Sequence, residues 1–262
     1  MVNIFKKGNN YFKSTIFFNS LKLFFSKPQK ILFFIITDLI LIACLLILNG
    51  LIGLLFNTLK VTSIALVLFI TLFNLIAIII LYSVARKKIL EILFSYKDKK
   101  AFEWKHLKEF TGINFLIYLT TLIISLLIAG IILFTIKEDY SKKTLGLIIG
   151  IIVVFVYTFL NFAHINFAKN RKFKHALDYA WKALSEYQSY KPLISSAVIF
   201  FIYLVIMSTI SVIVTLIVFK LSLNTTILQI YTATITIIGG AILYFCHLFN
   251  KVYYLNLIEL KS

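Results

Sequence analysis

The residue best placed to carry chemistry is Asp38, because it is the only acidic side chain inside an apolar stretch of this sequence. A carboxylate in hydrocarbon is costly, so such a residue by default faces a polar partner or a wet cavity. Asp38 lies seven residues beyond Ile31, or roughly 10 Å along a helix that rises about 1.5 Å per residue. We therefore expect it in a layer near one membrane face and not at the midplane.

Five other polar side chains fall in a similar layer of later apolar stretches. Three of them share one helical face of the fourth stretch at i, i+4 and i+7 spacing, and two lie toward the same end of the sixth. The pattern predicts a polar cluster in an inner vestibule with these members: Asp38, Tyr157, Asn161, His164, Tyr244 and His247. The expected charge-coupled pair is Asp38 with His164 or with His247.

A plainer interpretation of these residues is also open. Asp38 would then be protonated or bonded to a neighbour on its own helix, and the two histidines would be interfacial rings that reach the headgroups. Isolated polar residues near the ends of spans commonly reach water or other helices in this way. A water-accessible cavity at Asp38 would favour transport, whereas a closed, dry bundle would favour a structural role.

The elements that carry these residues are membrane spans. Hydrophobic residues make up 61% of the 262 positions and charged residues 14%, with a mean hydropathy of +0.97. A soluble domain averages about 45–50% apolar. Six stretches reach the ~20 residues that a helix needs to cross hydrocarbon: Ile31–Phe56, Val61–Ala85, Ile113–Thr135, Leu145–Ala168, Leu193–Phe219 and Thr226–Asn250. The sequence predicts an all-α, polytopic integral membrane protein of the cell membrane, with one membrane domain over residues 1–262.

Basic residues are divided unevenly between the two sides of these spans. Of the 27 Lys and Arg residues, 22 lie in four segments: Met1–Lys30, Arg86–Gly112, Lys169–Pro192 and Lys251–Ser262. The three connections on the opposite side hold only 5. Because cytoplasmic loops carry the excess of positive charge, both termini are predicted to be cytoplasmic. Anionic headgroups on that side account for the net charge of +17, so we expect membrane lipids and no nucleic acid as partners.

A short motif recurs before three of the apolar stretches. The heptapeptide that begins at Trp104 returns 77 residues later at Trp181, and a fainter copy begins at Phe18. In the second and third copies, apolar residues share one face of a helix and Lys lies largely elsewhere, which is typical of a helix that lies along a membrane surface. The predicted interfacial residues are Phe18, Leu21, Phe24, Trp104, Leu107, Phe110, Trp181, Leu184 and Tyr187.

The motif divides the chain into three repeats, about 1–85, 86–168 and 169–262. Each repeat combines an in-plane amphipathic helix with a transmembrane hairpin, so all three have the same orientation. Within each repeat, a helix break is expected between the in-plane helix and the first span. The expected positions are Lys27-Pro28, Thr111-Gly112 and Lys191-Pro192. Many secondary transporters instead contain inverted repeats and interrupted helices, which these Pro-free spans do not indicate.

The repeated W-x-x-L motif before each hairpin resembles that of poorly characterised prokaryotic six-helix membrane families. These families include the membrane domain that is fused to some glycerophosphodiester phosphodiesterases. No soluble phosphodiesterase domain is recognisable in this sequence, so the resemblance carries no catalytic residue onto it. It implies a membrane module of unknown biochemical role.

Signatures of enzymes are absent from the sequence. It contains no G-x-S-x-G, no H-E-x-x-H and no G-x-x-x-x-G-K-[ST] motif. The acids in or near its spans are too few for the multi-Asp metal site that lipid phosphotransferases use. No cofactor, metal or catalytic residue is predicted, and no protein partner is indicated. The sequence therefore predicts a non-catalytic membrane module that organises or senses the inner leaflet. The alternative is a transporter or channel for small solutes or lipids that uses the cluster around Asp38, and a lipid-modifying enzyme ranks third.

Overall fold

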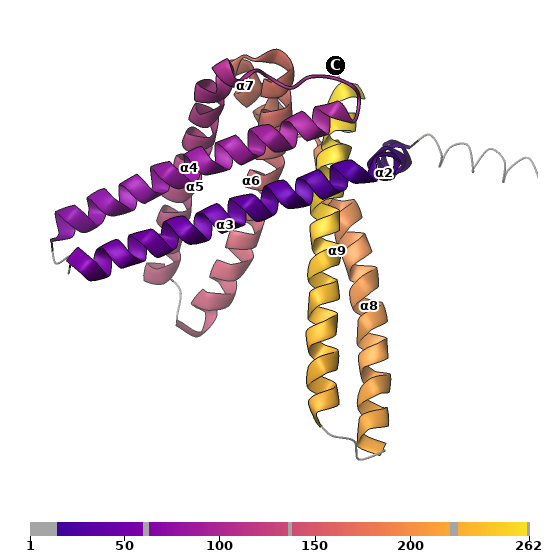
Figure 1. Cartoon of the computed structure of the whole chain (residues 1–262). Coiled ribbons are helices and arrows are strands. Elements are labelled where there is room, and N and C mark those ends of the chain that lie inside the picture. The colour runs from indigo at the N-terminus through magenta and orange to yellow at the C-terminus, as the bar shows by residue number, and fades with distance from the viewer. Residues whose placement is uncertain (1–14, 60–62, 136–137, 221–224, 261–262) are drawn as a thin grey trace, which may run out of the picture. The chain divides into compact units, whose positions relative to one another are not determined.

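The computed structural model describes residues 15–59, 63–135, 138–220 and 225–260, and every element in them is a helix (Figure 1). The long helices are α3 (Pro28–Leu59), α4 (Ile64–Ser95), α5 (Leu107–Thr135), α6 (Glu138–Asn170), α8 (Lys191–Lys220) and α9 (Thr225–Leu260). The short elements are α2 (Ile16–Ser26), η1 (Trp104–His106), α7 (Phe173–Leu184) and η2 (Tyr187–Tyr190). Six helices are long and apolar enough to cross a bilayer, so the prediction of an all-α, multi-pass membrane protein is confirmed.

The six long helices are apolar on nearly all sides. Large side chains such as Leu46 on α3, Phe69 on α4 and Leu126 on α5 leave 68%, 68% and 64% of their surface uncovered by protein. A helix that is hydrophobic all round and not covered by protein is suited to lipid rather than water. The hydrocarbon of the bilayer is therefore the solvent that these helices require.

The chain divides into two compact units. Unit 1 contains α2, η2, α8 and nearly all of α9, while unit 2 contains α3 to α7 together with η1. In unit 1, hydrogen bonds join the antiparallel helices α8 and α9 along their length. Ser196 Oγ donates to Asn250 Oδ1 at 2.8 Å, and Tyr203 Oη donates to the carbonyl of Ile235 at 2.7 Å.

The short helix α2 packs on the last part of α9 within unit 1. The Phe17 ring lies edge-on to Phe249 with 5.5 Å between centroids. Asn256 Nδ2 donates to Ser20 Oγ at 2.7 Å, and this bond is buried. Aromatic packing and a buried polar contact therefore hold α2 against α9.

In unit 2, α7 packs against α6 through a stripe of alanines. Ala176, Ala180 and Ala183 are all buried, and their i, i+4, i+7 spacing places them on one face of α7. Small side chains allow two helix backbones to approach closely. His175 Nδ1 also lies 2.9 Å from Asn166 Oδ1, which ties the beginning of α7 to the end of α6.

The helix breaks follow the sequence at two of the three expected positions. α2 ends at Ser26 and α3 begins at Pro28, where proline is well suited to the first turn of a helix. A break also precedes α8, which begins at Lys191. The break expected at Thr111-Gly112 is wrong, because α5 runs through both residues.

The second copy of the motif accordingly has no separate in-plane α-helix. Residues 97–103 form a turn and an extended segment, η1 covers Trp104–His106, and α5 follows directly from Leu107. One glycine costs a helix only about 1 kcal/mol relative to alanine, and the packed helix outweighs that cost. An alanine Cβ at Gly112 would lie 3.5 Å from the Phe173 ring, so the glycine faces α7.

Candidate functional site

Three consecutive cations, Arg86, Lys87 and Lys88, occupy the last turns of α4. Successive residues of a helix point about 100° apart, so their side chains diverge. Arg86 is 7% exposed and Lys87 only 1% exposed, whereas Lys88 is largely open. Two neighbouring cations are therefore buried in different surroundings on one helix.

The Arg86 guanidinium forms hydrogen bonds with two side chains of α6. Its Nε donates to His164 Nδ1 at 3.4 Å, and its Nη2 donates to Asn161 Oδ1 at 3.1 Å. Arginine has no acceptor, so Nδ1 of His164 must be the unprotonated ring nitrogen. The hydrogen of a neutral His164 ring is then on Nε2, which lies 2.6 Å from Asn114 Oδ1 and donates to it.

The hydrogen bonds continue from Asn114 to the backbone of α4. Asn114 Nδ2 donates to Ser83 Oγ at 2.8 Å, and Ser83 Oγ donates to the carbonyl of Ile79 at 2.7 Å. On the other branch, Asn161 Nδ2 donates to the carbonyl of Tyr157 at 2.8 Å. Each bond in this Arg86 network has one assignable donor. Donation therefore runs in one direction along both branches, from the guanidinium to the backbone carbonyls of Ile79 and Tyr157.

Aromatic rings surround the Arg86 network. The His164 ring lies 4.8 Å from the Phe110 ring, and the guanidinium carbon lies 6.0 Å from the Tyr82 centroid. Among the described residues, the guanidinium bonds only to neutral groups and not to a carboxylate. A buried cation without a counter-ion depends on such hydrogen bonds and on ring faces for its stability.

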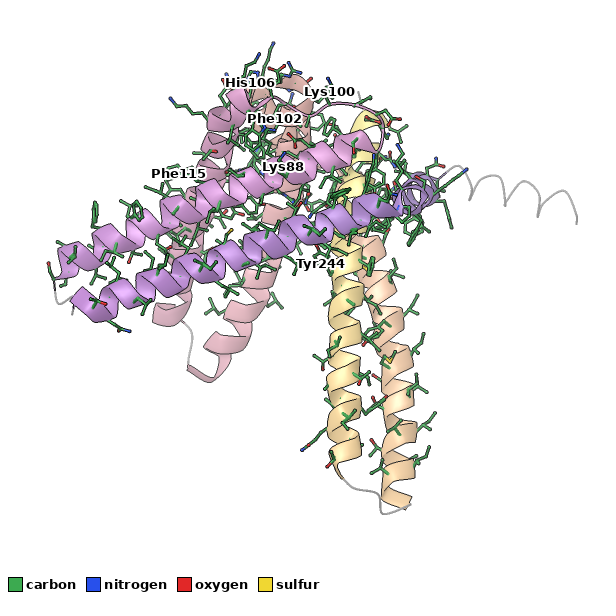
Figure 2. The ribbon with its side chains drawn as sticks, viewed as in Figure 1. Lys88, Lys100, Phe102, His106, Phe115 and Tyr244 are labelled. Carbon is green, nitrogen blue, oxygen red and sulfur yellow. The ribbon has the colours of Figure 1, made fainter. Side chains whose placement is uncertain are left out.

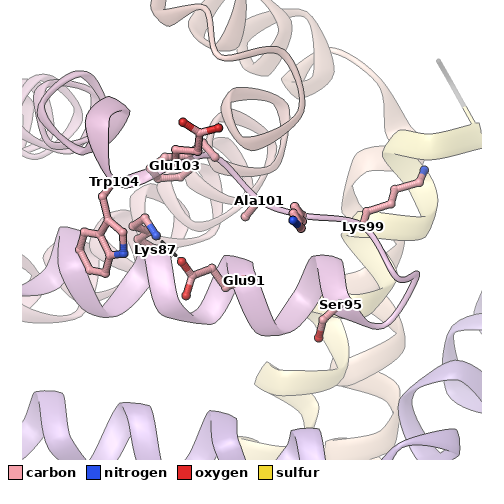
Figure 3. A pocket seen from close by; sticks show the side chains of 9 residues that line it. Lys87, Glu91, Ser95, Lys99, Ala101, Glu103 and Trp104 are labelled. Atoms are coloured by element: carbon pink, nitrogen blue, oxygen red, sulfur yellow. Dashed lines mark hydrogen bonds and ion pairs between the residues drawn. The ribbon is translucent and has the colours of Figure 1, made fainter.

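Lys87 points to a different side of α4, against aromatic rings of the segment that follows α4. Its ammonium is 3.9 Å from the centroid of the Trp104 ring and 5.7 Å from that of Phe102. It also pairs with Glu91, one turn later on α4 (Figure 3). Lys88 reaches the same two groups, at 5.3 Å from the Trp104 centroid and 2.9 Å from Glu91 Oε2. Figure 2 shows Lys88 and Phe102 beside the C-terminal half of α4.

A pocket of about 410 Å³ opens beside Lys87 (Figure 3). Its walls are formed by Lys87, Glu91, Ser95, Lys99, Lys100, Ala101, Phe102, Glu103 and Trp104. A hydrogen bond from Lys105 holds the pKa of Glu103 below its usual range. Among the described residues Lys100 has no ion-pair partner, so the pocket combines a free ammonium group with the exposed half of Trp104.

The structure brings part of the predicted polar cluster together. Asn161 and His164 meet at Arg86, and the backbone of Tyr157 accepts a bond from Asn161. Asp38 is half-buried on α3 of the same unit, but both ring nitrogens of His164 are taken by Arg86 and Asn114. The other two predicted members belong to α9 in unit 1, where their rings lie 6.4 Å apart: Tyr244 and His247.

The predicted interfacial residues divide into outward and inward groups. Trp104, Trp181 and Tyr187 are 50%, 73% and 70% exposed. Phe24 and Phe110 are buried, and Phe110 contacts the rings of the unit 2 core instead of lipid. The remaining four are Phe18, which is exposed, and Leu21, Leu107 and Leu184, which are half-buried. Trp104, Trp181 and Tyr187 are therefore the members best placed to meet a membrane.

Sequence reasoning missed three members of the Arg86 network: Ser83, Arg86 and Asn114. Arg86 was counted only as a marker of orientation, because it follows an apolar stretch. Its residue type was a usable signal, since only two of the 27 basic residues are arginine. Arginine is the cation preferred where several directed hydrogen bonds must be made in a buried site.

No family model, curated protein or solved structure matches this chain. The resemblance to the membrane domain of glycerophosphodiester phosphodiesterases therefore stays a prediction. Within the part of the chain that the structure describes, no three His, Cys, Asp or Glu side chains are grouped as metal ligands would be. The function has to be argued from the geometry of the residues themselves.

Proposed function

We propose that the protein is a non-catalytic membrane module that binds anionic lipids of the inner leaflet and thereby organises or senses that leaflet. The observation that carries this proposal is the contact of Lys87 and Lys88 with the ring of a half-exposed Trp104. Tryptophan favours the headgroup layer of a bilayer, where its ring is partly apolar and its N–H is polar. A lysine at the same depth attracts anionic headgroups.

The pocket beside Lys87 supplies the polar part of this proposed site. Lys100 is available for a phosphate oxygen, while Lys87 is already paired with Glu91. Each Lys or Arg near an anionic surface contributes about 1 kcal/mol to binding. A preference for anionic lipid of a few fold to roughly tenfold is therefore the size of effect that one such site supports.

The proposed orientation rests on the distribution of charge. The pocket belongs to the Arg86–Gly112 segment, one of the four that together hold 22 of the 27 basic residues. The positive-inside rule assigns these segments to the cytoplasm. The lipids within reach of the pocket are then those of the inner leaflet, which is rich in anionic headgroups.

We do not propose transport as the function. In that alternative Asp38 is coupled to His164 or to His247, and the bonds of His164 end on Arg86 and Asn114 instead. The Arg86 network then runs to backbone carbonyls of its own helices. Such bonds stabilise the packing of α4, α5 and α6 without requiring a solute.

The two tryptophans allow a direct test of the proposed function in the full chain. W181F leaves Trp104 as the only tryptophan, and brominated acyl chains quench tryptophan fluorescence on contact. In vesicles, we expect brominated phosphatidylglycerol to quench Trp104 more strongly than brominated phosphatidylcholine, and the difference to shrink as salt increases. Equal quenching by the two lipids at low salt would overturn the proposal.

Two lysine variants sharpen this test. Lys100→Gln removes the free ammonium group of the pocket and should reduce the preference of Trp104 for phosphatidylglycerol. Lys108→Gln is the matched control, because Lys108 is an exposed lysine of α5 that does not line the pocket. A loss of preference as large in Lys108→Gln as in Lys100→Gln would show a general surface charge instead of a site.

A further inference from the structure

A second cavity of about 780 Å³ lies in unit 2 between α5, α6 and α7, which Figure 1 shows next to one another. Its walls in the spans are mostly apolar and include Leu116 and Ile124 of α5 and Ile152 and Phe159 of α6. The polar exceptions in the spans are Thr120 and Thr121 of α5. Trp181 of α7 closes one end, with its ring edge-on to Phe159 at 6.4 Å. The cavity is thus an apolar groove whose end lies at the short helix α7.

In addition to the two threonines of α5, the groove has two polar groups at its α7 end. Ser185 is one of them, but its hydroxyl donates to the carbonyl of Lys182 and needs no other partner. Asp178 is different, because among the residues that the structure describes its carboxylate has no ion-pair or hydrogen-bond partner. An apolar groove that ends at a free carboxylate matches an amphiphile with a cationic headgroup.

The groove is built by rigid packing. The alanine stripe of α7 lies against α6, and the Tyr179 and Phe162 rings are 6.1 Å apart. The Phe173 ring at the beginning of α7 faces Gly112 of α5, 3.5 Å from where an alanine Cβ would lie. A preformed groove lowers the entropic cost of ordering a ligand, which favours one bound lipid over loosely attached bulk lipid.

The length of the groove decides between two classes of occupant. Leu116 and Ile124 are eight residues apart, or about 12 Å along α5. The hydrocarbon core is ~30 Å thick, so one leaflet supplies about half of that. An acyl chain of a single leaflet matches the groove, whereas a partner transmembrane helix would need a seam along the whole span.

We infer that this groove binds one acyl chain of a phospholipid whose headgroup carries a primary amine. The ammonium donates N–H bonds to the Asp178 carboxylate, and such charge-assisted bonds are stronger than neutral ones. Lys182, one turn later on α7, is available to the phosphate of the same lipid. A choline headgroup has no N–H and cannot make the bond to Asp178. This inference rests on the proposed contact of α7 with the membrane surface, and it concerns a different lipid and a different tryptophan from the pocket beside Lys87.

The test uses W104F, which leaves Trp181 in the groove as the only tryptophan of the full chain. The protein is reconstituted in vesicles that contain phosphatidylethanolamine or phosphatidylcholine with identical brominated chains. We expect at least twofold stronger quenching of Trp181 by phosphatidylethanolamine. Val156→Phe, which narrows the groove, should weaken quenching by both lipids.

Charge variants connect the preference to Asp178. Asp178→Asn should reduce quenching by phosphatidylethanolamine to the level of phosphatidylcholine, and Glu186→Gln, outside the groove, should leave the difference intact. Equal quenching by both lipids in W104F, or an unchanged preference in Asp178→Asn, would overturn the inference. Quenching that falls as the protein-to-lipid ratio rises would also overturn it, because a second copy would then occupy the groove. The Trp104 measurement fails or succeeds separately, so it distinguishes the two proposals.

Discussion

Arg86 Nε lies 3.4 Å from His164 Nδ1, and both side chains are more than nine-tenths buried. A permanently charged guanidinium thus faces an imidazole that must be neutral on the nitrogen it presents. The contact joins α4 to α6 through two residues that are 78 positions apart in sequence. We therefore regard the Arg86 network as the polar centre that sets how α4, α5 and α6 pack in unit 2.

Replacing Arg86 should destabilise unit 2. Arg86→Gln leaves Asn161 or His164 without its donor, and a buried polar group without a partner costs about 1–3 kcal/mol. Lys88→Gln on the same turn removes an exposed cation and should change stability by less than about 0.5 kcal/mol. Unfolding of the purified protein in mixed micelles, followed by circular dichroism, measures both. Equal stability of the two variants would contradict a structural role for the network.

Glutamine should replace His164 better than leucine does. In His164→Gln the amide oxygen can accept from Arg86 while the amide nitrogen donates to Asn114, as the neutral ring does. His164→Leu has a similar size but leaves Arg86 Nε and Asn114 Oδ1 without a partner. We expect the free energy of unfolding to fall by about 1–3 kcal/mol more for leucine than for glutamine. If leucine were the more stable replacement, the two hydrogen bonds of His164 would not stabilise the protein.

In unit 1, Gly239 and Tyr203 should be coupled. A Cβ at Gly239 would lie 3.0 Å from Tyr203 Oη, so Gly239→Ala must displace the hydroxyl that donates to Ile235. Losing that hydrogen bond costs about 1 kcal/mol. Tyr203→Phe lacks the hydroxyl, so adding Gly239→Ala to it should cost less than in the wild type. A double-mutant cycle measures this difference, and strictly additive costs would disprove the coupling.

The orientation in the membrane can be tested with single cysteines. Cys44 and Cys246 are first changed to alanine, since both are free thiols. The charge distribution predicts that a cysteine at position 139 is labelled by an impermeant thiol reagent from outside intact cells, and that one at position 99 is not. Labelling at 99 with protection at 139 would reverse the orientation and move the proposed lipid sites to the outer leaflet.

Much of the fold followed from local properties of the sequence. Each span was recognisable because about 20 consecutive apolar residues are needed to cross hydrocarbon, whatever they pack against. The break at Pro28 was predictable for the same kind of reason, since proline constrains the residue before it. The break expected at Gly112 is not formed, because a glycine only permits a bend, and α5 continues through Gly112, which faces Phe173 of α7.

The candidate site was predicted only in part, because its members come from separate helices. Asn161 and His164 were visible as polar residues on one helical face, but their partners Arg86 and Asn114 lie on α4 and α5. Sequence spacing specifies which residues share a helix face and leaves open which faces meet. The in-plane helices of the three repeats and the cytoplasmic position of both termini stay predictions, because both are defined relative to a bilayer.

The sequence by itself determined that the chain contains long apolar helices with basic segments between them, because hydrophobicity and charge are properties of each residue. Only the tertiary structure decided that Arg86 points inward to His164 while the adjacent Lys87 packs on Trp104. It also placed Phe110 in the core and left Trp181 exposed at the groove, although both belong to the same repeated motif. The physical reason is that burial depends on which neighbouring helix covers a face, and that neighbour is distant in sequence.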